Sequence, residues 1–170
     1  MSALSVSGNI KMKFLTYWII STLLLLAASQ LCLAQGSNVL STTLPDKVTA
    51  KTGATVQAKM SVQLRPGYHV NSNTPSDAYL IPLKLTWAPG ALEAAEVVYP
   101  KPLMEKYSFS PDPLSVFSGE FEILTKFNVS SKAAAGPTAI TGKLRYQACT
   151  DRMCLPPKNV DVALQVDIVK

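Results

Sequence analysis

Apolar and polar residues alternate along most of the chain after residue 35, with an apolar side chain at every second position. The last such stretch is the clearest, because the apolar residues from Val160 to Ile168 alternate with residues such as Asp161 and Gln165. The same period occurs within residues 54–64, 83–87, 121–129 and 140–148. Successive side chains of a β-strand point to opposite faces, so this period predicts half-buried strands.

Short segments rich in Pro and Gly separate these stretches and predict turns. They lie at residues 65–67, 88–90, 110–113 and 135–137. Only two short segments, residues 92–97 and 132–135, are compatible with a helix. Because each strand has one apolar face, two antiparallel sheets must cover each other. About seven to nine strands in this length predict an all-β, immunoglobulin-like antiparallel β-sandwich.

The first 34 residues follow a different pattern. Lys11 and Lys13 precede an uncharged apolar run over residues 14–28, and small residues follow at Cys32 and Ala34. This order is typical of a cleavable secretory signal. The run is shorter than the roughly 20 residues that a membrane anchor needs. We therefore expect a signal peptide at residues 1–34, one domain at residues 35–170, and no stable membrane insertion after cleavage.

The net charge of the chain argues against nucleic-acid binding. Without the two lysines of the predicted signal, the chain has 14 basic and 11 acidic residues, a net charge of +3. This small excess is spread along the chain and forms no basic stripe of the kind that nucleic acid requires. We therefore expect no nucleic-acid partner.

Cys149 and Cys154 are the two cysteines outside the predicted signal. In an exported protein they meet an oxidising compartment, so we expect a disulfide between them. It encloses only four residues and would join the two sides of a hairpin. Because Tyr146 and Ala148 share the apolar side of their strand, the alternation predicts that Cys149 lies on the solvent side.

Spacing alone leaves two interpretations of this pair. A structural disulfide that closes about six residues contributes only roughly 2 kcal/mol. An accessible pair is a reactive one, and Arg152 and Lys158 would favour a thiolate whereas Asp151 would oppose it. A structural staple and a redox pair are both compatible with the spacing. A metal site is not expected, since two sulfurs and the single imidazole of His69 are too few ligands for zinc.

Residues 99–119 lack a clear period. They include four prolines together with Tyr107, Phe109 and Phe117. A loop of about 20 residues is long for a compact domain, and such loops are often functional lids. The alternative is a surface loop whose aromatic residues belong to the core.

Three motifs resemble the N-terminal periplasmic domain of DsbD, the thiol:disulfide interchange protein. The first is Tyr146-Gln147-Ala148-Cys149 with Cys154-Leu155-Pro156-Pro157. The second, residues 67–73 with 79–82, resembles the start of that domain in stand-alone bacterial forms. The third, Phe117-Ser118-Gly119-Glu120, stands where that family has an aromatic-x-Gly cap beside the cysteines. The resemblance covers nearly all of the chain after the predicted signal.

The resemblance implies an immunoglobulin-like domain with a redox-active disulfide that works by thiol–disulfide exchange without a metal or organic cofactor. By analogy, Cys154 is the sulfur of the mixed disulfide and Cys149 resolves it. Phe117 would shield the pair in a cap with Ser118 and Gly119, hinged at Pro113 and Gly119. The other residues expected to line the site are Tyr68, His69, Asn71, Tyr146, Asp151 and Pro156.

The resemblance also implies partners. A thioredoxin-like or membrane-embedded carrier would donate electrons, and oxidised proteins in the periplasm of a Gram-negative bacterium would accept them. The cysteine loop is one residue shorter than in the best-known form, and Ser115 and Val116 replace its acidic residues. No transmembrane carrier or thioredoxin-like domain follows, so we expect a separate donor protein. The alternative is a non-catalytic binding module of the same fold with a structural hairpin disulfide.

Overall fold

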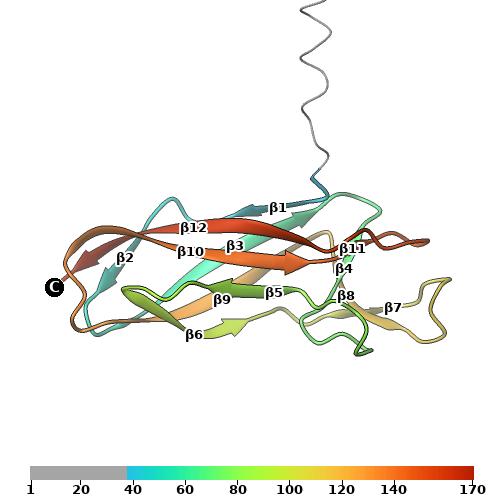
Figure 1. Cartoon of the computed structure of the whole chain (residues 1–170), viewed down its shortest axis with the longest axis horizontal. Helices are drawn as coiled ribbons and strands as arrows, with labels where there is room; N and C mark the ends of the chain where they lie inside the picture. Colours follow the sequence, from blue (N-terminus) through green and yellow to red (C-terminus); the bar gives the residue numbers. More distant parts are fainter. Residues whose placement is uncertain (1–37) are drawn as a thin grey trace, which may run out of the picture. The chain divides into compact units, whose positions relative to one another are not determined.

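The computed structural model describes residues 38–170, and every regular element in this part of the chain is a β-strand (Figure 1). The all-β prediction is confirmed. The strands are β1 (Leu40–Thr43), β2 (Val48–Lys51), β3 (Thr55–Leu64), β4 (His69–Asn71), β5 (Lys84–Trp87), β6 (Leu92–Val98), β7 (Leu103–Glu105), β8 (Leu114–Ser118), β9 (Glu120–Val129), β10 (Gly136–Tyr146), β11 (Ala148–Cys149) and β12 (Lys158–Val169).

Two four-stranded sheets form a sandwich. Their strand orders are β1-β3-β9-β6 and β2-β12-β10-β5. In chain order, the first sheet takes the places of strands A, B, E and D of an immunoglobulin constant domain, and β5, β10 and β12 take those of C, F and G. Pairing is antiparallel throughout both sheets except where β2 runs parallel to β12. The predicted immunoglobulin-like sandwich is confirmed.

The apolar residues of the alternating stretches form the core between these sheets. On β12, Val162, Leu164, Val166 and Ile168 are all buried. From β9, Phe127 is fully buried and meets the ring of Trp87 edge-on, with ring centroids 5.2 Å apart. The two-residue period therefore located the core face of each long strand.

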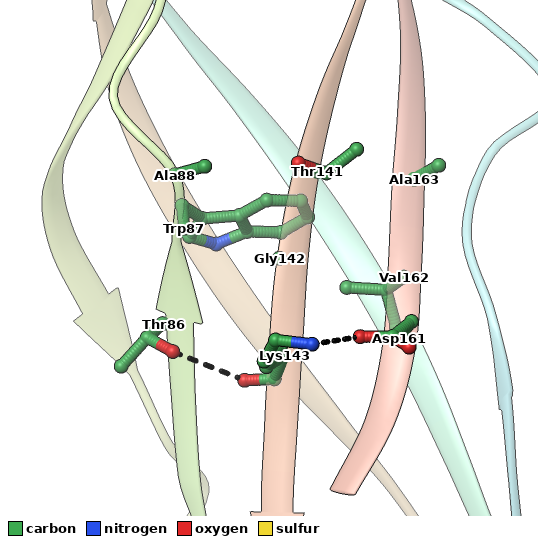
Figure 2. A pocket seen from close by; sticks show the side chains of 9 residues that line it. All are labelled: Thr86, Trp87, Ala88, Thr141, Gly142, Lys143, Asp161, Val162 and Ala163. Atoms are coloured by element: carbon green, nitrogen blue, oxygen red, sulfur yellow. Dashed lines mark hydrogen bonds and ion pairs between the residues drawn. The ribbon is translucent and has the colours of Figure 1, made fainter.

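Trp87 also lies against a glycine, as Figure 2 shows. Gly142 is its register partner on β10, and a Cβ atom at Gly142 would come within 2.8 Å of the indole ring. A pocket of about 480 Å³ opens here on the outer side of the sheet. Its rim carries the exposed ion pair between Lys143 and Asp161. Gly142 is therefore needed for space and not for an unusual backbone conformation.

Two segments that were compatible with a helix are not helical. Residues 92–97 lie in β6, the edge strand beside β9, and residues 132–135 lie in the turn that precedes β10. Helix propensity is a weak local preference, and pairing with β9 overrides it.

A third sheet, of order β11-β4-β8-β7, lies at the end of the sandwich away from the C-terminus (Figure 1). It corrects the prediction of a long loop, because residues 99–119 contain β7 and β8. Those strands form by pairing with each other and with β4. Such pairing between distant segments leaves little local signal in short strands. These short strands are also why the described region has more strands than predicted.

The predicted signal peptide, residues 1–34, lies outside the described residues. Within residues 38–170, no helix is both long and apolar enough to cross a membrane.

Candidate functional site

Cys149 and Cys154 form a disulfide, as expected, with an S–S distance of 2.02 Å and Cα atoms 3.9 Å apart. The Leu155 N–H donates to the Ala148 carbonyl, and the Thr150 N–H donates to the Met153 carbonyl, both at 2.8 Å. These bonds flank the cysteines and leave them as a non-hydrogen-bonded pair, the position where facing side chains approach closest. The disulfide therefore joins the two sides of a hairpin, as predicted.

The two cysteines differ in exposure. Cys149 is only 1% exposed, whereas Cys154 is half-buried. The prediction that Cys149 lies on the solvent side is wrong. The alternation of β10 ends at Tyr146, and the chain then enters β11 in the third sheet, where both faces are covered. Only Cys154 is left partly accessible.

Strand register shows which residues share the face of Cys149. His69 on β4 lies opposite Cys149 on one side and opposite Ser118 on the other. Directly opposed residues point to the same face of a sheet. The other face of these strands carries Ala148, Val70 and Phe117, which belong to the core.

Phe117 therefore does not occupy the loop position predicted for it. It lies in β8, is 3% exposed, and packs in the core with its ring centroid 4.8 Å from that of Phe121. Gly119, with φ of 66°, is the single residue between β8 and β9, and its carbonyl accepts a hydrogen bond from Leu64. A shielding role for Phe117, with hinges at Pro113 and Gly119, remains a prediction.

Tyr107 covers the face of His69, although no sequence motif placed this tyrosine in the site. The two rings are stacked with centroids 4.0 Å apart. The Tyr107 hydroxyl donates to the Glu105 carboxylate. The following residue, Ser108, donates to the Asp151 carbonyl at 3.1 Å, which ties this segment to the cysteine turn. The detectable signal was an aromatic residue in a proline-rich segment, but its partner was not predictable locally.

An open cavity of about 440 Å³ lies beside these residues, and neither cysteine lines it. Its lining includes four of the predicted site residues, Tyr68, His69, Ser118 and Asp151, together with Gly67, Glu105 and Tyr107. The remaining predicted residues lie elsewhere. Asn71 is buried, and its amide donates to the Ile81 carbonyl at 3.1 Å. Tyr146 belongs to the core, and Pro156 is exposed after the hairpin.

Two titratable groups of the cavity, His69 and Tyr107, have pKa values shifted toward their neutral forms. Burial lowers the pKa of His69, and the nearby Glu105 carboxylate partly opposes this effect. Burial raises the pKa of Tyr107, and its hydrogen bond to Glu105 raises it further. Within residues 38–170 no group of three or more His, Cys, Asp or Glu side chains could hold a metal ion. The arrangement is suited to disulfide chemistry next to a neutral imidazole.

Because the pKa of His69 is lowered in the folded protein, we expect the free energy of unfolding to depend on pH. The unfolded chain binds a proton at His69 more readily than the folded protein, so the free energy of unfolding falls as pH drops below 6.5, the ordinary histidine pKa. Denaturant unfolding of the oxidised protein on both sides of that pH measures the loss. A His69→Phe variant should lose less stability over the same range, and an equal loss in both proteins would contradict this account.

The fold and the site define a class of protein: an immunoglobulin-like β-sandwich domain with a hairpin disulfide in a small sheet at one end. Residues 40–165 match the family model described as thiol:disulfide interchange protein DsbD, N-terminal. The chain therefore belongs to the DsbD N-terminal family.

Solved structures give weaker similarities. The N-terminal periplasmic domain of ScsB from Proteus mirabilis is 15% identical with a TM-score of 0.49, over 75% of this chain and 45% of that one. A cohesin module from a Clostridium perfringens family 33 glycoside hydrolase is 7% identical with a TM-score of 0.44, over 78% of this chain and 100% of the module. A comparison with curated protein sequences gives no match.

Proposed function

We propose that the protein is a periplasmic thiol–disulfide interchange module that relays electrons through Cys149 and Cys154. A thioredoxin-like or membrane-embedded carrier donates the electrons, and oxidised periplasmic proteins accept them. The observation that carries the proposal is the unequal burial of the two sulfurs in a domain of the DsbD N-terminal family. A relay needs one sulfur that a partner can reach and a second that is held beside it.

The proposed reaction begins with the reduced pair. The Cys154 thiolate attacks a client disulfide, so a Cys154–client bond forms and the first client sulfur leaves as a thiolate. Cys149 then attacks Cys154, the intramolecular disulfide forms, and the second client sulfur leaves. The client gains two electrons and the pair loses two. A donor dithiol returns the pair to the reduced state by the same exchange.

Exposed apolar side chains near the cysteine turn support a protein partner. Met153 in the turn is 60% exposed. Phe109, beside the Ser108 that is hydrogen-bonded to the turn, is 43% exposed. Leu103 and Met104, on β7 at the opposite edge of the third sheet, are 49% and 62% exposed. Apolar groups gathered at one end of a domain are typical of a protein contact surface.

A second candidate function is a non-catalytic binding module in which the disulfide is a structural staple. The burial of Cys149 favours this alternative, because buried disulfides are inert. The two candidates differ in whether Cys154 exchanges with a partner.

Trapping of mixed disulfides distinguishes the relay from the non-catalytic binding module. In a Cys149→Ser variant expressed in the exporting host, Cys154 has no resolving partner, so mixed disulfides with clients or donor should accumulate. Non-reducing gels would reveal adducts that disappear on reduction, and mass spectrometry would identify them. The matched control is Cys149→Ser combined with Cys154→Ser, which should give no adduct. If the single variant gives none, and thioredoxin-like reductants leave the wild-type disulfide intact, the staple interpretation is correct.

A further inference from the structure

The only histidine of the chain has a ring nitrogen that the fold leaves unsatisfied. His69 is 3% exposed, and its Nε2 atom is enclosed without a hydrogen-bond partner among the described residues. Buried polar atoms are nearly always paired, so an unpaired one calls for an explanation. The steps of the proposed relay involve the two cysteines and give the Nε2 atom no role.

His69 shares one face of the third sheet with the buried Cys149. His69 and Cys149 are direct register partners on β4 and β11, and side chains of such pairs share a face with Cβ atoms about 4.5–5.5 Å apart. The ring of Tyr107 is stacked on the imidazole. In the oxidised protein the Cys149 sulfur carries no proton. After reduction it becomes a thiol, which is a weak donor and a proton source beside Nε2.

The surroundings keep the imidazole ready to accept that proton. Burial lowers the pKa of His69, so the ring is neutral at neutral pH and Nε2 accepts a proton in the Nδ1–H tautomer. The Glu105 carboxylate stabilises the imidazolium once it forms, since its charge acts to raise the pKa of His69. The titratable groups that line the cavity with His69 are Tyr68, Glu105, Tyr107 and Asp151.

The buried thiol needs such a base. An ordinary cysteine has a pKa of about 8.5, so most of its molecules carry the thiol form at neutral pH. Only the thiolate attacks a disulfide, and an adjacent base is a common means of activating a poor nucleophile. Cys154 does not share this need to the same degree because it is partly exposed to solvent.

We propose that His69 is the general base of the resolving step, taking the proton of the Cys149 thiol as that sulfur attacks Cys154. The Cys149 S–H bond breaks and the proton moves to Nε2. The Cys149–Cys154 bond forms as the Cys154–client bond breaks. The client sulfur leaves as a thiolate and takes the proton from the imidazolium, which returns His69 to the neutral form. This inference rests on the proposed relay and names a further catalytic residue for it.

Stopped-flow kinetics with an aromatic disulfide, such as dithiobis-nitrobenzoate, separates the two steps. Reduced protein releases one coloured thiolate when Cys154 attacks and a second when Cys149 resolves the adduct. In His69→Phe, which preserves the ring stack on Tyr107, the second phase should be about 100-fold slower at neutral pH, within the usual range for a lost general base. The first phase is the internal control and should keep its wild-type rate.

The pH profile provides a readout that a structural role would not change. The wild-type second phase should slow at acidic pH as His69 becomes protonated, whereas the variant rate should rise with hydroxide up to the thiol pKa. A second phase with wild-type rate and profile in His69→Phe would overturn the inference and leave the relay intact. Failure of the relay itself would appear separately, as absence of adducts with Cys149→Ser.

A measurement on the wild-type protein covers the case in which His69→Phe does not fold. With one histidine in the chain, the ring nitrogen signals in a ¹⁵N NMR spectrum are unambiguous. On reduction, the Cys149 thiol should donate to Nε2, so the Nε2 resonance should move more than that of Nδ1. An Nε2 resonance that is unchanged between the oxidised and reduced proteins would refute the contact.

Discussion

A Cys154→Ser variant is expected to reduce a client disulfide no faster than buffer alone, because the sulfur that begins the exchange is gone. Among residues 38–170 Cys149 is left as the only thiol, but at 1% exposure it is out of reach of a client. The assay is a single turnover of the reduced protein with an oxidised client, followed by acid quenching and thiol alkylation. Wild-type protein should transfer two electrons to the client in the same assay.

Cys149→Ser is the matched control. Both variants lose the same disulfide, which closes a loop of about six residues and contributes roughly 2 kcal/mol, so loss of the disulfide itself cannot explain a difference in chemistry. Cys149→Ser should still attack the client and then stop at the mixed disulfide. The assignment of roles would be reversed if Cys154→Ser formed the adduct and Cys149→Ser did not.

Phe127→Ala should lower the free energy of unfolding by about 3–5 kcal/mol, the usual cost of removing a fully buried aromatic ring. Phe127 is 0% exposed and meets the ring of Trp87, so its loss leaves a cavity between the two sheets and removes an aromatic contact. Urea unfolding of the oxidised protein, monitored by far-ultraviolet circular dichroism, measures the change.

Phe109→Ala removes the same ring from an exposed position. Phe109 is 43% exposed and stacks on Tyr107 with ring centroids 5.5 Å apart, so we expect its truncation to cost at most about 1.5 kcal/mol. Equal losses in the two variants would contradict the packing account. Phe127 belongs to a different core cluster from Tyr146 and Ala148. A folded Phe127→Ala protein should therefore keep the reactivity of its cysteine pair.

The unequal exposure of the two cysteines bears on whether the disulfide is a redox relay or a structural staple. The spacing of Cys149 and Cys154 was compatible with an accessible, reactive pair and with a structural disulfide. The structure shows an intermediate case, with one sulfur enclosed beside His69 and the other at the surface of the hairpin. This asymmetry supports the proposed roles of Cys154 as the attacking cysteine and Cys149 as the resolving cysteine.

The sequence by itself determined the long strands, their inward faces and the disulfide. These features are local: a two-residue period appears in each strand, and two cysteines five residues apart need no information from elsewhere. On β12, for example, all four residues from Val162 to Ile168 that the period placed inward are buried. The motifs around Cys149 and Cys154 also sufficed to indicate the family.

Only the tertiary structure decided what surrounds the disulfide. The third sheet forms from short strands that are far apart in sequence, so no local period marked β7 and β8 or showed that Phe117 faces the core. The same pairing reversed the expected exposure of Cys149, because β11 begins a new sheet after Tyr146. It also brought Tyr107 onto His69, and His69 beside Cys149. Contacts between distant segments depend on strand register, and alternation within one strand does not specify the register of its partner.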